Sequence, residues 1–167
     1  LVGRNGSGKT TLLKMLSGLL IPCRGEINCD IKNYQASYID NNPRSFFLRV
    51  SCLENLYYFG AINNLSKTGV DDFIYEKFNS LRIEGFIQKP MNEISQGQNQ
   101  LIAIARGLMT SPDLVLYDEV FSSLDKTTLE RLENIIENYR DEKTSIHIFS
   151  SHYDKILSQF TSEIIRL

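Results

Sequence analysis

The residues Gly3-Arg4-Asn5-Gly6-Ser7-Gly8-Lys9-Thr10 match the pattern G-x-x-x-x-G-K-[ST]. In this pattern the glycines let the backbone bend until successive N–H groups point at one anion, and the helix that follows adds its N-terminal dipole. Lys9 would then reach the β- and γ-phosphates of a nucleotide, and the Thr10 hydroxyl would be a ligand of Mg²⁺. We therefore predict phosphate binding by Gly3, Arg4, Asn5, Gly6, Ser7, Gly8, Lys9, Thr10 and Thr11.

The sequence around this stretch has the order of strand, loop and helix that such a loop requires. Leu1-Val2 is typical of the end of a buried strand, and residues 9–17 carry leucines at helical spacing. Strands that alternate with helices indicate a parallel sheet covered by helices. Further strand patterns occur at about 26–31, 37–40, 114–117, 144–149 and 163–167, and helix patterns at about 51–62, 70–81, 95–109, 126–140 and 153–160.

Residues from about 44 to 109 interrupt this alternation, because they carry helix patterns and no convincing strand. We therefore expect an α/β fold with a mostly parallel sheet and an inserted helical subdomain at about 44–109. Together with the phosphate-loop pattern, this arrangement resembles the P-loop NTPase type. The length of 167 residues is typical of a single domain, which we take as 1–167.

The composition excludes several other classes of protein. Hydrophobic residues make up 42% and charged residues 23%, as in an ordinary globular domain. The net charge of −2 gives no sign of a strongly basic nucleic-acid surface. The 3 cysteines show no C-x-x-C spacing, which argues against a zinc site or a disulfide framework. No apolar run reaches the roughly 18 residues that a membrane-spanning helix needs.

A second candidate site follows the apolar run 114–117, which ends in Asp118 and Glu119. In open α/β sheets, ligands bind at the carboxyl ends of the strands. We therefore expect Asp118 to lie near the Mg²⁺ of the phosphate loop. Glu119 would lie one residue further along, where it could accept a proton from an attacking water or orient it.

Three further segments carry a family resemblance. Ser95-Gln96-Gly97-Gln98 and the helix after it strongly resemble the signature of ABC-type ATPases, usually LSGGQ, and stand before the acidic strand. Residues 122–125, Ser-Ser-Leu-Asp, resemble the D-loop of that family, and 150–152, Ser-Ser-His, resemble the strand end that carries its switch histidine. The ordered motifs cover nearly the whole chain.

The resemblance implies an ATP site shared between two such domains packed head to tail. ATP on the phosphate loop of one domain would be covered by the signature of the other, and Asp125 would organise the opposing site. Glu119 would be the catalytic base and His152 would contact the γ-phosphate, whereas we assign no role to His147. The signature residues expected to bind nucleotide are Ser95, Gly97 and Gln98.

The chain departs from the family pattern at several positions. Asn41 stands where a glutamine is usual, so we expect its shorter amide to contact Mg²⁺ or water. Gln96 replaces the middle glycine of the signature. The strands that normally precede the phosphate loop, with the aromatic residue that stacks on adenine, are missing from 1–167.

The resemblance implies ATP hydrolysis that powers transport across a membrane. The expected ligands are ATP and Mg²⁺, and the expected partners are a transmembrane permease and a second ABC ATPase domain, on the cytoplasmic face of the membrane. The alternative is a translation-factor type that acts on ribosomes. DNA-repair types insert a long coiled coil, but only 86 positions separate Lys9 from Ser95, without sustained heptads. A P-loop kinase would carry no signature, and a nucleic-acid partner is not expected.

Overall fold

The structure is a computed structural model, and it describes residues 1–28, 34–121, 124–142, 145–151 and 163–167. Its sheet consists of β1 (Ala36–Asp40), β2 (Leu114–Asp118) and β3 (Ile146–Ser150). The helices are α1 (Lys9–Leu16), α2 (Cys52–Ile62), α3 (Lys67–Phe73), α4 (Gln96–Leu108) and α5 (Lys126–Glu142). Short turns of 3₁₀-helix lie at Pro43–Ser45, Asn79–Leu81, Ile83–Gly85 and Met91–Glu93.

The sheet is parallel, with the strand order β1-β2-β3. At its far edge Val2 forms parallel bridges with Ser151 and with Arg166, so the start of the chain lies beside the end of β3. The predicted strand at 163–167 is reduced to this bridge at Arg166. The arrangement confirms a parallel α/β fold and places the phosphate loop at the carboxyl edge of the sheet.

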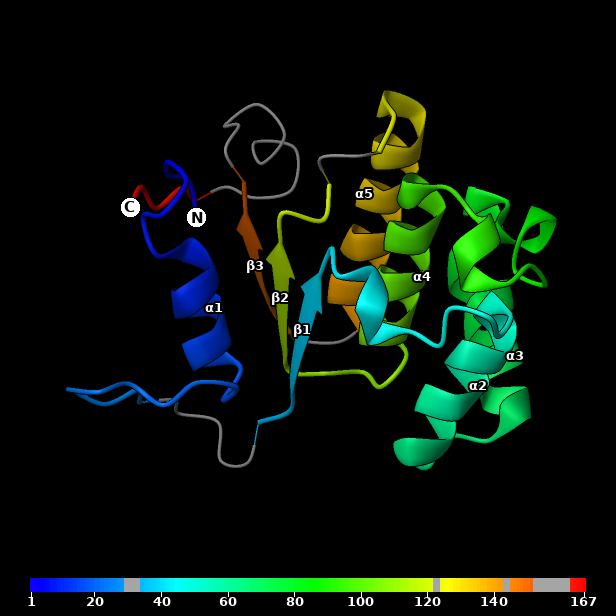
Figure 1. Cartoon of the computed structure of the whole chain (residues 1–167), viewed down its shortest axis with the longest axis horizontal. Coiled ribbons are helices and arrows are strands. Elements are labelled where there is room, and N and C mark those ends of the chain that lie inside the picture. Colours follow the sequence, from blue (N-terminus) through cyan, green and yellow to red (C-terminus); the bar gives the residue numbers. More distant parts are fainter. Residues whose placement is uncertain (29–33, 122–123, 143–144, 152–162) are drawn as a thin grey trace.

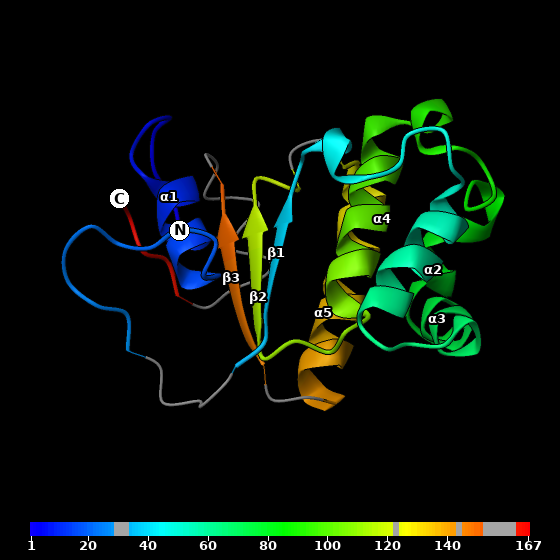
Figure 2. The same ribbon diagram turned by 60° about the horizontal axis from the view of Figure 1, so that its bottom comes forward.

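Helices cover both faces of the sheet (Figures 1 and 2). α1 lies on one face, where the Lys14 ammonium sits 5.8 Å from the centre of the Tyr38 ring on β1. α4 and α5 lie on the other face. α4 approaches β1 closely at Gly107, because a Cβ built there would lie 2.5 Å from Cδ1 of Ile39. A side chain at position 107 would therefore force the helix away from the sheet.

α2 and α3 pack beyond α4, away from the sheet, and form the helical part expected between β1 and the signature (Figure 2). Two helices there begin as the sequence indicates. The Ser51 side chain accepts a bond from the Glu54 N–H and Glu54 reaches back to Ser51, which is a capping box at the start of α2. Ser95 and Gln98 form the same reciprocal pair at the start of α4.

The prediction of one helix at 70–81 is wrong in its bounds and its regularity. The helix begins earlier, at Lys67, because the Ser66 hydroxyl caps it by accepting from the Gly69 N–H at 3.0 Å. After Phe73 it continues as a π-helical turn at Ile74–Phe78 and a 3₁₀ turn at Asn79–Leu81. The widened turn keeps Phe78 and Leu81 buried in the core.

The remaining differences are smaller. Residues 26–28 form no strand, and the rest of the strand predicted at 26–31 lies outside the described residues. The helix predicted at 153–160 also lies outside them. α5 continues to Glu142, two residues past its predicted end. Within the described part of the chain, no helix is long and apolar enough to cross a bilayer.

Candidate functional site

The phosphate loop has the backbone that its glycines predict. Gly6 and Gly8 have φ of 80° and 98°, a left-handed conformation that residues with a Cβ rarely adopt. The Gly8 carbonyl accepts the first bond of α1, from the Leu12 N–H at 2.8 Å. The N-cap residue Gly8 makes no side-chain cap bond, and the N-terminus of a helix in this position favours an anion.

A cavity of about 300 Å³ lies directly over this loop. Glu119 reaches it just after the end of β2, so one member of the predicted acidic pair lies at the phosphate loop, whereas Asp118 is not among the residues that line this cavity. The cavity is lined by Asn5, Gly6, Ser7, Gly8, Lys9, Thr10, Thr11 and Glu119.

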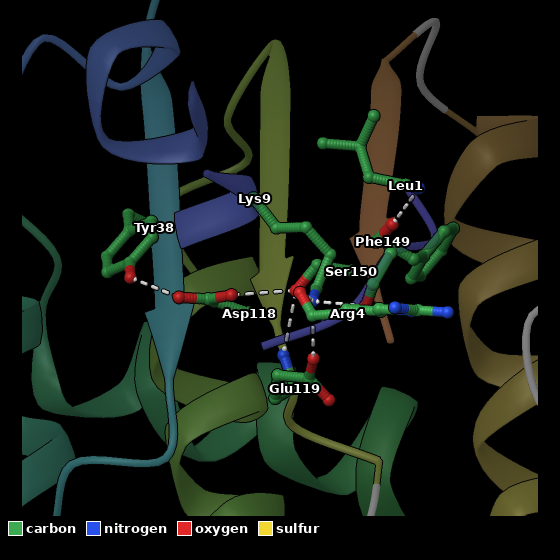
Figure 3. Close-up of polar contacts among 9 residues, drawn as sticks. Leu1, Arg4, Lys9, Tyr38, Asp118, Glu119, Phe149 and Ser150 are labelled. Carbon is green, nitrogen blue, oxygen red and sulfur yellow. Dashed lines mark hydrogen bonds and ion pairs between the residues drawn. The ribbon is translucent and has the colours of Figure 1, made fainter. Parts of the chain in front are cut away.

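Lys9 is folded back over the loop and is only 6% exposed. Its ammonium donates to the carbonyls of Gly3 at 2.8 Å and Arg4 at 3.2 Å, and lies 3.6 Å from Oε1 of Glu119 (Figure 3). The cation is therefore held at the loop, with its charge balanced by carbonyl oxygens and a carboxylate.

Asp118 ends β2 and is 7% exposed, and its two carboxylate oxygens have separate partners. Oδ2 accepts from the Tyr38 hydroxyl and Oδ1 from the Ser150 hydroxyl, both at 2.7 Å (Figure 3). Burial, and then the bond to Asp118, raise the pKa of Tyr38 far above its ordinary value. Tyr38 is thus a hydrogen-bond donor at every working pH.

Glu119 turns the chain out of the strand with a φ of 57°, in the left-handed region. Its N–H donates to the Ser150 hydroxyl at 3.1 Å, and its side chain is 27% exposed on the cavity side. This bend separates the two acidic side chains. The Asp118 carboxylate lies between the hydroxyls of Tyr38 and Ser150, whereas the Glu119 carboxylate lies against Lys9 (Figure 3).

The oxygen ligands at this edge fit Mg²⁺ that arrives with a nucleotide. Mg²⁺ usually uses one or two carboxylates together with substrate phosphates and water. Asp118 and the exposed Thr10 hydroxyl at the start of α1 provide such oxygens. Among the described residues no group of three or more His, Cys, Asp and Glu forms a self-contained metal site. Asn41 follows β1, half-buried, and is absent from the lining of the phosphate-loop cavity.

The signature residues line a different cavity, of about 650 Å³. Ser95, Gly97 and Gln98 at the start of α4 meet Asp125 there. Asp125 caps α5, because its carboxylate accepts from the Thr128 N–H at 3.0 Å and hydroxyl at 2.7 Å. These bonds lower the pKa of Asp125. No described residue lines both cavities, so Ser95, Gly97, Gln98 and Asp125 are separated from the phosphate-loop residues 5–11. Gly3, Arg4 and Asn41, also predicted to bind nucleotide, line neither cavity.

The sequence motifs give no sign of the contact between Tyr38 and Asp118, and they include Ser150 only as part of a strand end. Both are placed by the sheet register, in which Ser150 pairs with Asp118 and Tyr38 lies two residues before the partner of Asp118 on β1. A single sequence carries no signal for that register. His152 and residues 122–123 lie outside the described residues.

Comparison with known protein families shows to which family this chain belongs. The model of one family, described as ABC transporter, matches residues 1–122. The chain belongs to the ABC transporter family. Its fold and its motifs are those of an ABC ATPase domain of the P-loop NTPase superfamily, which binds ATP.

Two ABC relatives align along the entire chain. The ABC transporter ATP-binding protein NatA of Bacillus subtilis is 28% identical over 176 residues, which are 71% of its length. An ABC transporter ATP-binding protein of Pyrococcus abyssi is 32% identical over 178 residues, which are 68% of its length. The chain thus spans about two thirds of these relatives.

Two solved structures share the fold. An ATP-binding subunit of an ABC transporter superposes with a TM-score of 0.85 over 99% of this chain and 72% of that one, at 21% identity. An archaeal ribosome recycling factor, solved with a ribosomal stalk protein, superposes with a TM-score of 0.78 over 99% of this chain and 31% of that one, at 24% identity. At these identities the likeness concerns the ABC fold alone.

Proposed function

We propose that this ABC ATPase domain powers transport across a membrane, as the nucleotide-binding subunit or domain of a transporter. The observation that carries the mechanism is the division of the nucleotide ligands between two cavities, with the phosphate loop in one and the signature in the other. The names of the two relatives with full-chain alignments favour the transport role.

ATP binding starts at the phosphate loop. The N–H groups at the start of α1 and the ammonium of Lys9 would receive the phosphates, in a cavity of about 300 Å³. Thr10 and Asp118 would hold Mg²⁺, which when bound neutralises the negative charge that develops on the phosphates. Asn41 would reach the metal or its water only if its loop moves toward the cavity.

Hydrolysis needs a water positioned beyond the γ-phosphate. Glu119 lines the cavity with Oε1 3.6 Å from the Lys9 ammonium, where its carboxylate would hold that water and accept its proton. His152 would contact the same phosphate. Because phosphoryl transfer requires mainly positioning and charge stabilisation, we assign these groups to the first half of the catalytic site.

A single copy holds both halves of the site but keeps them apart. A second copy packed head to tail would bring its signature, with the N-terminus of α4, over the nucleotide on the first copy. Ser95, Gly97 and Gln98 would then contact the γ-phosphate, and Asp125 would lie at the opposing site. The dimer would close on ATP and open after hydrolysis.

The permease is proposed to meet the helical part of the domain, on the cytoplasmic face of the membrane. Exposed large apolar side chains cluster there before and along α2, including Phe47 and Tyr58, whose rings contact edge to face at 4.8 Å between centroids. Such side chains suit an interface that is covered in the assembled transporter.

The test of the shared site uses Glu119→Gln in the full-length protein, which retains ATP because it does not hydrolyse it. Molecular mass is measured by light scattering with and without Mg-ATP. We expect a monomer without nucleotide and a dimer with it. A folded Glu119→Gln protein that stays monomeric at saturating Mg-ATP contradicts the head-to-tail site.

The transport role is tested separately, by fractionating cells that express the tagged full-length protein. We expect it to sediment with membranes and to be released together with an integral membrane protein after detergent extraction. Sedimentation with ribosomes in a salt-resistant and nucleotide-dependent manner would overturn transport in favour of a translation factor.

A further inference from the structure

The carboxylate of Asp118 is held from both sides by hydroxyl groups of the neighbouring strands. Tyr38 on β1 binds Oδ2 and Ser150 on β3 binds Oδ1, each at 2.7 Å. The final torsion of an aspartate is broad and roughly two-fold when nothing restrains it. Two opposed donors fix the carboxylate plane, and each oxygen keeps a lone pair free for a metal or its water.

Ser150 has a second bond that extends this arrangement to the next residue. Its hydroxyl oxygen accepts from the Glu119 N–H at 3.1 Å, while its own hydrogen goes to Asp118. The direction is settled by chemistry, because an ionised carboxylate only accepts and a backbone N–H only donates. Ser150 therefore joins the proposed metal ligand to the backbone of the proposed base.

The backbone of Glu119 needs such support. Its φ of 57° is left-handed, a conformation that is unfavourable for a residue with a Cβ. That bend is also what directs the Glu119 carboxylate to the cavity side, against Lys9, and away from Asp118. A residue that holds the bend thus controls where the carboxylate lies.

We propose that Tyr38 and Ser150 are positioning residues for ATP hydrolysis: both orient Asp118 toward the metal-nucleotide complex, and Ser150 also holds Glu119 in its bent backbone conformation. This inference rests on the proposed roles of Asp118 and Glu119. It predicts that loss of the Tyr38 hydroxyl weakens metal binding alone. Loss of the Ser150 hydroxyl should weaken metal binding and also lower the rate of hydrolysis.

A plainer role for the two hydroxyls is to satisfy a carboxylate that is almost completely buried. Loss of either hydroxyl would then lower stability without a specific effect on the metal. The two roles differ in the metal affinity of the nucleotide complex, and in how that affinity compares with nucleotide binding in the absence of metal.

The experiment uses Tyr38→Phe, Ser150→Ala and the conservative Ser150→Thr in the full-length protein. Tyr117→Phe is the matched control, because it removes a buried hydroxyl from the opposite face of the same sheet, where Tyr117 contacts His147 at 3.1 Å. Mn²⁺ is titrated into the ADP complex and followed by electron paramagnetic resonance. ADP binding in EDTA and steady-state ATP hydrolysis are measured on the same samples.

We expect Tyr38→Phe and Ser150→Ala to weaken Mn²⁺ binding about tenfold, the effect of losing one hydrogen bond to a charged group. ADP binding in EDTA should stay as in the wild type. Ser150→Ala should also lower kcat at saturating metal, whereas Tyr38→Phe should not, and Ser150→Thr should recover both quantities. Tyr117→Phe should match the wild type in all of them.

Wild-type Mn²⁺ affinity in both Tyr38→Phe and Ser150→Ala would overturn the proposal. Because Tyr38→Phe removes a single oxygen atom, it decides the metal role even where a Ser150 variant fails to fold. Asp118→Asn tests the proposed metal role of Asp118 separately from the positioning roles of Tyr38 and Ser150. If Asp118→Asn binds Mn²⁺–ADP as the wild type does, the proposed role of Asp118 is itself wrong.

Discussion

The ammonium of Lys9 lies 3.6 Å from Oε1 of Glu119, so the cation proposed to bind phosphate and the carboxylate proposed to act as base contact each other directly. Lys9 is almost completely buried, and water screens such a pair less than it screens a pair on the surface. The phosphates of a nucleotide have to compete with Glu119 for this ammonium. The contact thus couples the binding of nucleotide to the position of the base.

This coupling predicts that Glu119→Gln binds nucleotide more tightly than the wild type in the absence of metal. The substitution removes the competing charge and its repulsion of phosphate, while it keeps the size of the side chain. We expect the Kd of a fluorescent ADP analogue in EDTA to fall about fivefold, which corresponds to an ion pair worth about 1 kcal/mol.

The matched control is Glu130→Gln, which breaks an ion pair of the same length outside the site. Lys126 and Glu130 are also 3.6 Å apart, but their side chains are 84% and 54% exposed. Nucleotide affinity should not change in this variant. Weaker binding by Glu119→Gln than by the wild type would show that Glu119 supports the phosphate site and does not compete with it.

The two capping boxes offer a second prediction, because they have the same geometry and different proposed roles. Ser51 starts α2 and Ser95 starts α4. We expect Ser51→Ala and Ser95→Ala each to lower the free energy of unfolding by about 1 kcal/mol, the usual effect of losing an N-cap. Only Ser95→Ala should also weaken ATP-dependent dimerisation of the Glu119→Gln protein, since Ser95 is proposed to contact the second nucleotide.

The stability of Ser51→Ala and Ser95→Ala is measured by urea unfolding, and their dimerisation by light scattering, on the same samples. If both alanine variants weaken dimerisation in proportion to their loss of stability, the Ser95 hydroxyl has a structural role alone. If neither does, the signature cavity does not receive nucleotide through Ser95.

The features of this domain that depend on neighbouring residues could be predicted from the sequence. The left-handed glycines of the phosphate loop, and the capping boxes at Ser51 and Ser95, are each set by residues within a few positions of one another. The acidic pair was expected at the edge of the sheet from the ligand rule for open α/β sheets, and Glu119 does line the phosphate-loop cavity.

The features that depend on distant residues could not be predicted in this way. Tyr38 meets Asp118 across 80 positions, and Ser150 meets it across 32, through a register that only the folded sheet defines. The π-helical turn at Ile74–Phe78 likewise departs from the regular helix that its sequence favours, and its Ile74 and Phe78 are buried in the core.

His147, in the middle of β3, is a titratable group outside the site. Its Nδ1 contacts the Tyr117 hydroxyl at 3.1 Å and its Nε2 contacts the Ser145 hydroxyl at 2.9 Å. The ring also packs against Tyr139 of α5. Burial, with a smaller effect from the charge of Arg140, lowers the pKa of His147 from 6.5 to about 4.

The depressed pKa of His147 predicts a loss of stability in mild acid. Between its folded pKa of about 4 and its ordinary 6.5, the unfolded chain binds more protons at this residue than the folded one. The free energy of unfolding therefore decreases as the pH falls through this window, by at most about 1.4 kcal/mol per pH unit from this residue.

His147→Gln keeps a polar side chain and removes the titration. Urea unfolding from about pH 7 to about pH 5 should show a shallower loss for the variant than for the wild type. Parallel curves would mean that His147 takes up its proton as readily in the folded sheet as in the unfolded chain.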